Sequence, residues 1–191
     1  ILLTAFRSVQ LDADLTTSSW ARRQAVADLA ATVLQEKLHH LRDLTLSFST
    51  RKQFGSLVAR GEWDDAMNIL RDVPQKDFPY IERIFLTDPQ GVLKVDRPEV
   101  PGVRGKDFSD RDWYRSVTRK WETSVSEIDR RTAEPRYNVI SVAAPIREPE
   151  TERVAGILVI QVRLKTVLDW ARSIDTGGSG VVYFIDKNAN G

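Results

Sequence analysis

The stretch Phe108-Ser-Asp-Arg-Asp-Trp-Tyr-Arg115 combines a helix start, a cation and two aromatic rings. Ser109 and Asp112 resemble a capping box, which predicts Ser109 as the N-cap and Asp110 as the first helical residue. A guanidinium, an indole N–H and a phenol at a helix N-terminus could hold a small carboxylate, because Arg is a fork-shaped donor and helix N-termini favour anions. The alternative is that Arg111 belongs to a solvated charge cluster with its neighbouring aspartates.

Strand-like segments surround this stretch on both sides. The residue pattern predicts five strands, at residues 80–87, 92–95, 123–130, 136–146 and 154–162. The first two form a hairpin, because Asp88-Pro-Gln-Gly91 has Pro at its second position and a closing Gly. Residues 154–162 are almost continuously apolar and should form a central strand. Helical patterns at residues 62–71 and 164–174 complete an α+β fold with an antiparallel sheet of about five strands.

A long helix is predicted before the sheet. Apolar residues recur at three- and four-residue steps from residue 16 to about residue 49, and no Pro or Gly occurs from residue 1 to residue 54. A helix of this length spans about 45 Å or more, which favours an element that runs along the domain or pairs with a second copy of itself. His39 and His40 are adjacent on this helix, so they point in different directions, and we expect both at the surface.

Composition excludes several classes of protein. The chain has 191 residues, 41% of them hydrophobic and 29% charged, with a formal net charge of +1 and no cysteine. There is no basic tract for nucleic acid, no disulfide and no thiolate metal site. We also find no Gly-rich phosphate loop, no carboxylate pair with acid/base spacing and no His at a plausible base position. These absences predict no catalytic residues, no bound metal and no cofactor such as haem or flavin.

Both ends of the sequence suggest a segment of a longer protein. No run approaches the roughly 20 apolar residues that span a bilayer. Residues 1–6 are nevertheless apolar, and we expect either the end of a transmembrane helix or an ordinary apolar helix turn. A strand-like run at residues 181–186 is followed by a turn-like Asp-Lys-Asn-Ala-Asn-Gly sequence.

Several motifs together resemble the double Cache family, the PAS-like extracytoplasmic sensor domains of bacterial transmembrane receptors. The resemblance lies in the hairpin at residues 85–93, the Arg-x-Trp-Tyr signature within residues 107–114, and the segments 138–146, 156–161 and 181–191. It implies two PAS-like modules strung along the long helix. Residues 7–175 would form the membrane-distal module, and residues 176–191 would begin a truncated membrane-proximal one.

The resemblance also implies a function. Such domains bind a small molecule on the periplasmic or extracellular side of the cell membrane and signal to a histidine kinase, a chemoreceptor output or a diguanylate cyclase, often as a homodimer through the long helix. The alternative is a module without a ligand that dimerises or senses through a partner protein. That alternative predicts a filled pocket, with Arg111 paired to Asp110, Asp112 or Asp129.

Candidate ligand-binding residues follow from the resemblance. In amino-acid-binding members the Arg and Trp of the signature hold the ligand carboxylate, and these are Arg111 and Trp113 here. Amine-binding members carry an Asp where this chain has Gln161, and a desolvated ammonium needs a negative partner, so we expect a small carboxylate without an amine. One of Arg130, Arg131 and Arg136 could add a second anion contact and favour a dicarboxylate. The full predicted set is Arg111, Trp113, Tyr114, Asp129, Arg131, Tyr137, Ser141 and Gln161.

Overall fold

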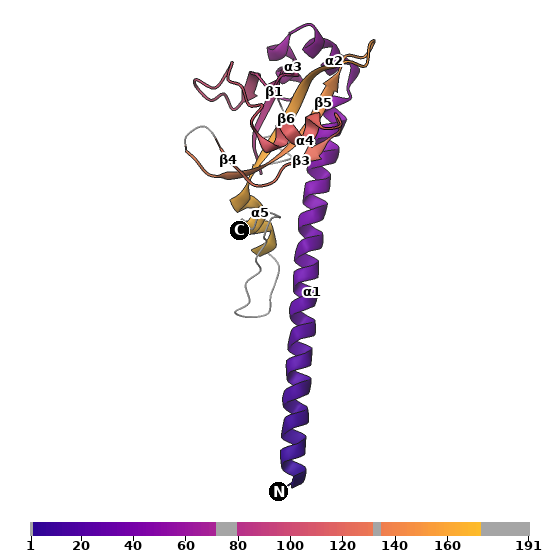
Figure 1. The fold of residues 1–191 in the computed structure, drawn as a ribbon, viewed down its shortest axis with the longest axis vertical. Helices are drawn as coiled ribbons and strands as arrows, with labels where there is room; N and C mark the ends of the chain where they lie inside the picture. Colours follow the sequence, from indigo (N-terminus) through magenta and orange to yellow (C-terminus); the bar gives the residue numbers. More distant parts are fainter. Residues whose placement is uncertain (1, 72–79, 132–134, 173–191) are drawn as a thin grey trace.

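A computed structural model describes residues 2–71, 80–131 and 135–172, and it confirms an α+β fold (Figure 1). The elements in chain order are α1 (Leu2–Ser49), α2 (Lys52–Ala59), α3 (Trp63–Ile69), β1 (Ile81–Thr87), β2 (Leu93–Arg97), α4 (Asp112–Thr118), β3 (Ser124–Val125), β4 (Asp129–Arg130), β5 (Asn138–Arg147), β6 (Val154–Arg163) and α5 (Leu164–Arg172). The predicted strand at residues 181–186 and the predicted second module at residues 176–191 lie outside the described residues.

The sheet is antiparallel with the order β2-β1-β6-β5-β3, and β4 also pairs with β5. The apolar strand β6 lies at its centre, as its composition predicts. Six strands replace the expected five because residues 123–130 pair with β5 as two short strands instead of one. Between them, Ser126 donates its backbone N–H to the Ser141 carbonyl at 2.8 Å, and its hydroxyl accepts the Ser141 N–H at 3.0 Å. This side-chain contact interrupts the regular ladder.

Strand alternation gives the sheet two different apolar faces. On one face, side chains such as Ile84 and Ile160 form the larger core cluster with α1, α2 and α3. On the other face, Phe85 and Val159 form a second cluster with Phe108, Trp113 and Val117. Helix α4 therefore covers the face opposite the long helix.

Helix α1 is longer than predicted, because it begins at Leu2 and contains 48 residues, about 72 Å at 1.5 Å per residue. The absence of any Gly or Pro up to residue 54 explains why nothing ends it earlier. Its C-terminal part packs on β5 and β6 through side chains such as Leu41. In Figure 1 its N-terminal part extends alone beyond the sheet. Within the described residues, no helix has an apolar stretch long enough to cross a bilayer.

The start of α4 differs from the predicted one. The helix begins at Asp112, and Arg111 occupies the N-cap position with extended backbone angles. The prediction of Ser109 as the N-cap is wrong, because its N–H is bound by the Asp107 carboxylate at 2.8 Å. Asp112 cannot complete a capping box either, since its carboxylate accepts the Glu127 N–H at 2.9 Å. Arg111 therefore precedes the helix and does not lie in its first turn.

Candidate functional site

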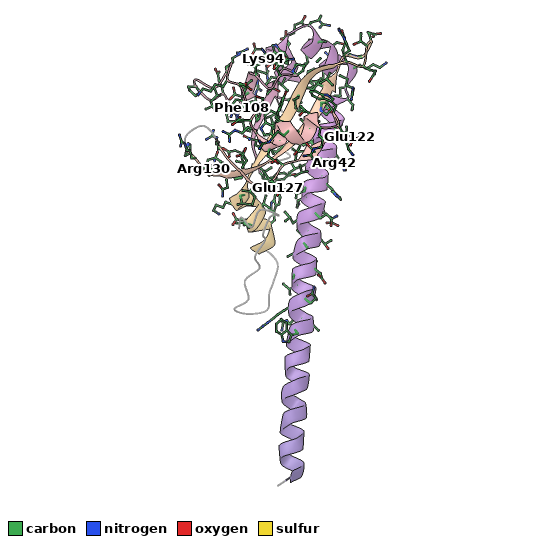
Figure 2. The ribbon with its side chains drawn as sticks, viewed as in Figure 1. Arg42, Lys94, Phe108, Glu122, Glu127 and Arg130 are labelled. Atoms are coloured by element: carbon green, nitrogen blue, oxygen red, sulfur yellow. The ribbon has the colours of Figure 1, made fainter. Side chains whose placement is uncertain are left out.

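A small cavity lies on the α4 face of the sheet, and five of the eight predicted binding residues line it. Its volume is about 20 Å³, and a single water needs about 10–15 Å³, so side chains nearly fill the cavity. Phe108 and Arg130, two of its wall residues, are labelled in Figure 2. The complete lining is Arg83, Phe85, Phe108, Arg111, Trp113, Asp129, Arg130, Arg131, Val139 and Gln161.

Arg111 points into this cavity and is paired there with Asp129. Its Nη1 donates to the two carboxylate oxygens of Asp129 at 3.1 and 3.4 Å, and to the backbone carbonyl of Arg130 at 3.3 Å. The two side chains are 22% and 24% exposed, so the pair lies at the boundary between the cavity and solvent. The Nε of Arg111 is 3.6 Å from the carboxylate of exposed Asp110.

Trp113 forms an apolar wall of the cavity. Its side chain is buried, and its ring packs edge-on against Phe85 with centroids 5.6 Å apart. Tyr114 does not line the cavity, because the next position on a helix points about 100° away. Its hydroxyl donates to the Pro89 carbonyl at 3.0 Å. Its ring covers Gly91, where φ is +90° and an added Cβ would lie 3.0 Å from the ring, so a glycine is required there.

Three polar side chains form a row across neighbouring strands. Gln161 on β6 is paired with Arg83 on β1 and with Ser141 on β5. The Gln161 side-chain N–H donates to the Ser141 hydroxyl at 3.1 Å. Gln161 lines the cavity, whereas Ser141 is fully buried behind it. Ser141 therefore orients Gln161 and is not itself a lining residue.

Tyr137 lies next to the cavity, in a separate cluster at the end of the sheet. Its ring packs beneath the guanidinium groups of Arg131 and Arg163, and its hydroxyl donates to the Glu82 carboxylate. Arg163 also donates to Glu82, from Nε at 2.6 Å and Nη2 at 3.1 Å. Burial opposes ionisation of Glu82, but the hydrogen bonds from Arg163 and Tyr137 outweigh it and lower the pKa of this carboxyl group. This cluster holds in place the residues next to the end of β4 and the start of β5, where Arg131 donates its backbone N–H to the Tyr137 carbonyl at 2.9 Å.

Sequence reasoning missed Arg83. Its side chain is 5% exposed and is paired with Asp96, which is 2% exposed. Both Nε and Nη2 of Arg83 donate to the same oxygen of Asp96, at 3.1 and 2.5 Å, and this oxygen also accepts the Val100 N–H at 2.9 Å. Burial lowers the pKa of Arg83, and the Asp96 charge opposes that shift. The sequence did contain an indication of its role. Arg83 lies two positions before Phe85 on an apolar strand, so both side chains point to the same face of the sheet.

A larger groove of about 490 Å³ lies between the end of α1, the start of α2 and the end of β5. Arg42 and Glu122, two of its lining residues, are labelled in Figure 2. The four cations among its described lining residues are all exposed, namely Arg42, Arg51, Lys52 and Arg147. Water therefore solvates them, and an excess of charge there is weak evidence for a ligand. None of the predicted binding residues lines it, so we place the candidate site at the smaller cavity.

The fold of the chain is the one found in the ligand-binding domains of bacterial chemoreceptors. The chain is similar to the domain of the Pseudomonas aeruginosa amino acid chemoreceptor PctB solved with L-Arg, with a TM-score of 0.63 and 21% identity over 83% of this chain and 63% of that one. It is also similar to the Pseudomonas fluorescens chemoreceptor CtaA with L-valine, with a TM-score of 0.63 and 18% identity over 82% and 65%. A third similar structure is the ligand-binding domain of the Campylobacter jejuni chemoreceptor Tlp3 with 4-methylisoleucine. Its TM-score is 0.63 and its identity is 13%, over 81% of this chain and 62% of that one.

These are Cache-type sensor domains and not enzymes, so the fold expected from the resemblance is confirmed. The chain spans less than two thirds of the length of each of these three structures. No protein-family model and no curated protein sequence matches the chain. The structural likeness establishes the fold, and the residues of the cavity must carry any argument about the ligand.

Proposed function

We propose that the chain is the extracytoplasmic ligand-binding module of a bacterial receptor, and that the cavity under α4 binds a small organic anion mainly through Arg111. The observation that carries this proposal is the imbalance of charge around the cavity. Among the described residues, four arginines line it, and Asp129 is the one lining carboxylate. Counting Asp96 behind Arg83 still leaves more cations than anions. Arg83 and Arg111 already have carboxylate partners, so the excess positive charge lies on half-buried Arg131 and exposed Arg130. An anionic ligand fits this environment, because it would be attracted by the excess positive charge at the cavity.

The ligand should lack an amine. The chemoreceptor domains named above were solved with amino acids, whose ammonium group needs a negative partner. In this chain Gln161 is neutral and already donates to Ser141, and Asp129 is already engaged by Arg111. The ammonium group of an amino acid in the cavity would be repelled by four guanidinium groups. A carboxylate, with Trp113 as an apolar wall for its carbon chain, meets no such repulsion.

Binding requires the cavity to enlarge. Sites for small molecules are commonly about 300–1,000 Å³ in volume, far more than the cavity found here. The long side chains of Arg130 and Arg131 form part of its wall, and Arg130 is exposed. Side-chain rotamer changes are common on binding, so we expect these two side chains to move when a ligand enters.

The remaining parts of the proposal concern the whole receptor. Residues 1–6 would be the end of a transmembrane helix, and the domain would lie on the periplasmic or extracellular side of the cell membrane. Trp20 is 65% exposed on α1, and pairing of two copies along this side of α1 would cover it. A small displacement on ligand binding would then pass along α1 to a histidine kinase, a chemoreceptor output or a diguanylate cyclase.

Substitution of Arg111 tests the site. We expect Arg111→Gln to weaken binding of small carboxylates by about 10- to 100-fold in isothermal titration calorimetry, since a hydrogen bond between charged groups contributes about 1.5–3 kcal/mol. Arg115→Gln is the matched control, because Arg115 is exposed on α4 and does not line the cavity. Equal affinities of the Arg111→Gln variant and the unmodified protein would rule out this site.

A second function has its own support, namely a coupling module without a ligand. The two features expected of such a module are the Arg111–Asp129 pair and a cavity that side chains nearly fill. It predicts no saturable binding of any organic anion to the unmodified protein. A thermal-shift screen with mono- and dicarboxylates distinguishes the two functions, because only a ligand-binding module gains stability with rising ligand concentration.

A further inference from the structure

We propose that Arg83 supplies a second anion contact in this cavity, so that the site takes a short organic acid with two negatively charged groups. This inference rests on the proposed ligand-binding function and adds the class of ligand. It depends on a residue that the sequence analysis did not select. The sequence suggested Arg130, Arg131 or Arg136 as the second anion contact. Of these, Arg130 and Arg136 are exposed.

Arg83 lies on a different element from Arg111. It projects from β1, directly beside Gln161 of β6, whereas Arg111 precedes α4 and pairs with Asp129 of β4. Both guanidinium groups line the same cavity. A ligand held only at Arg111 would leave Nη1 of Arg83, which does not bind Asp96, without an anionic acceptor. A ligand with an anionic group at each end can engage both cations.

The guanidinium of Arg83 is held in place and retains donors for a ligand. Asp96 binds the edge formed by Nε and Nη2 through a single oxygen. That oxygen is itself fixed by the Val100 N–H. Among the described residues, Nη1 of Arg83 donates no hydrogen bond, and its two N–H groups remain available. Because Arg83 is already ordered, a ligand would lose little free energy in fixing this side chain.

A purely structural role explains Arg83 less well. A buried Arg–Asp pair is weak evidence for stability, since well-packed apolar residues of similar volume often replace such a pair without loss. The same face of the sheet is otherwise packed with apolar side chains such as Phe85 and Val159. Burial disfavours the charge on Arg83 more than Asp96 restores it, so its pKa is lowered. A further anion beside Arg83 would stabilise its charged form.

The first test uses the unmodified 191-residue chain and three probes of similar length. Succinate has two carboxylates, monomethyl succinate has one and a neutral ester, and butyrate has one and a methyl group. In calorimetry, succinate should bind about 10- to 100-fold more tightly than either monoanion, as expected for one more charge-assisted hydrogen bond. Malonate and glutarate vary the distance between the two carboxylates, so that a poor fit in length is not mistaken for a missing contact.

The outcomes separate this inference from the proposed function. If butyrate binds through Arg111 and none of the three dicarboxylates binds more tightly, the second contact is refuted and the proposed function stands. If none of the probes binds, both are refuted. A preference for a dicarboxylate over its monoanionic counterparts supports both.

A double variant tests whether Arg83 itself is the contact. Arg83→Gln alone would leave the Asp96 carboxylate buried without a partner, so the two are changed together as Arg83→Gln/Asp96→Asn. The preference for succinate over butyrate should disappear, because the affinity for succinate should fall by a larger factor than the affinity for butyrate. A preference that persists overturns the assignment to Arg83. If the melting curve shows that the double variant does not fold, the comparison of succinate with monomethyl succinate still decides whether a second anion contact exists.

Discussion

Asp129→Asn is the most informative single substitution, because in the proposed site Asp129 would compete with the ligand for Arg111. Among the described residues it is the one carboxylate that lines the cavity, and it accepts two hydrogen bonds from Arg111. Asn preserves the size of the side chain and one acceptor oxygen but removes the charge. If the cavity binds anions, this substitution should strengthen binding. If it binds an ammonium group, the same substitution should weaken it.

The size of the effect follows from Coulomb's law. Two carboxylates about 6 Å apart repel one another by about 0.7 kcal/mol at the dielectric constant of water and by about 2.8 kcal/mol at an effective value of about 20. The Arg111–Asp129 pair is partly exposed, so the true repulsion lies between these limits. Affinity for a carboxylate should therefore rise about 3- to 100-fold, since about 1.4 kcal/mol corresponds to a factor of ten. Stability should fall by no more than about 1 kcal/mol, because partly exposed ion pairs contribute little.

Calorimetry with succinate and butyrate measures the affinity, and thermal unfolding measures the stability. Asp110→Asn is the matched control, because Asp110 is also near Arg111 but is 76% exposed and outside the cavity lining. It should change affinity much less. A loss of affinity in Asp129→Asn as large as that in Arg111→Gln would show that Asp129 holds the ligand. That result would refute the reasoning from an excess of positive charge.

Two further predictions concern stability. The pKa of Glu82 is lowered in the folded protein, so its hydrogen bonds stabilise the fold above the ordinary glutamate pKa of about 4.3. This contribution is lost as the pH falls through the lowered pKa. The difference in melting temperature between the unmodified protein and Glu82→Gln should therefore be largest near neutral pH and vanish in acid; a difference independent of pH would contradict it. Gly156→Ala should lower the free energy of unfolding by about 1–3 kcal/mol in urea. The added Cβ would lie 2.7 Å from the Thr87 carbonyl oxygen and 2.9 Å from Val58 Cγ1. An unchanged midpoint of urea unfolding would show that β6 can shift away from these atoms.

Local patterns in the sequence were sufficient to predict most of the fold. The nearly continuous apolar run of β6 predicts a strand at the centre of the sheet, and Asp88-Pro-Gln-Gly91 predicts the β1–β2 hairpin; both are confirmed. The prediction failed where a side chain from elsewhere overrides a local signal. Ser109 has the residue type of an N-cap, but the Asp107 carboxylate takes its N–H. Asp112 is drawn to Glu127, fifteen positions away.

The site shows the same division between local and long-range information. Arg111 and Trp113 stand together in the sequence, so a short signature was enough to select them. Arg83 gains its place from the registers of β1 with β6 and β2, which no local pattern specifies. Its neighbours Gln161 and Asp96 are distant in the sequence, and only the pairing of β1 with β6 and β2 brings them beside Arg83.

Arg111 and Arg83 also differ in how freely their side chains can adjust to a ligand. Arg111 is the N-cap residue of α4, and its half-buried side chain lies at the boundary between the cavity and solvent. Arg83 stands within a strand, is almost fully buried, and is held by Asp96. A side chain at a chain turn can adjust to the ligand, whereas one clamped inside a sheet can only accept a ligand that places a negative charge beside it. We therefore propose that Arg111 binds a carboxylate as such, and that Arg83 determines the choice among carboxylates.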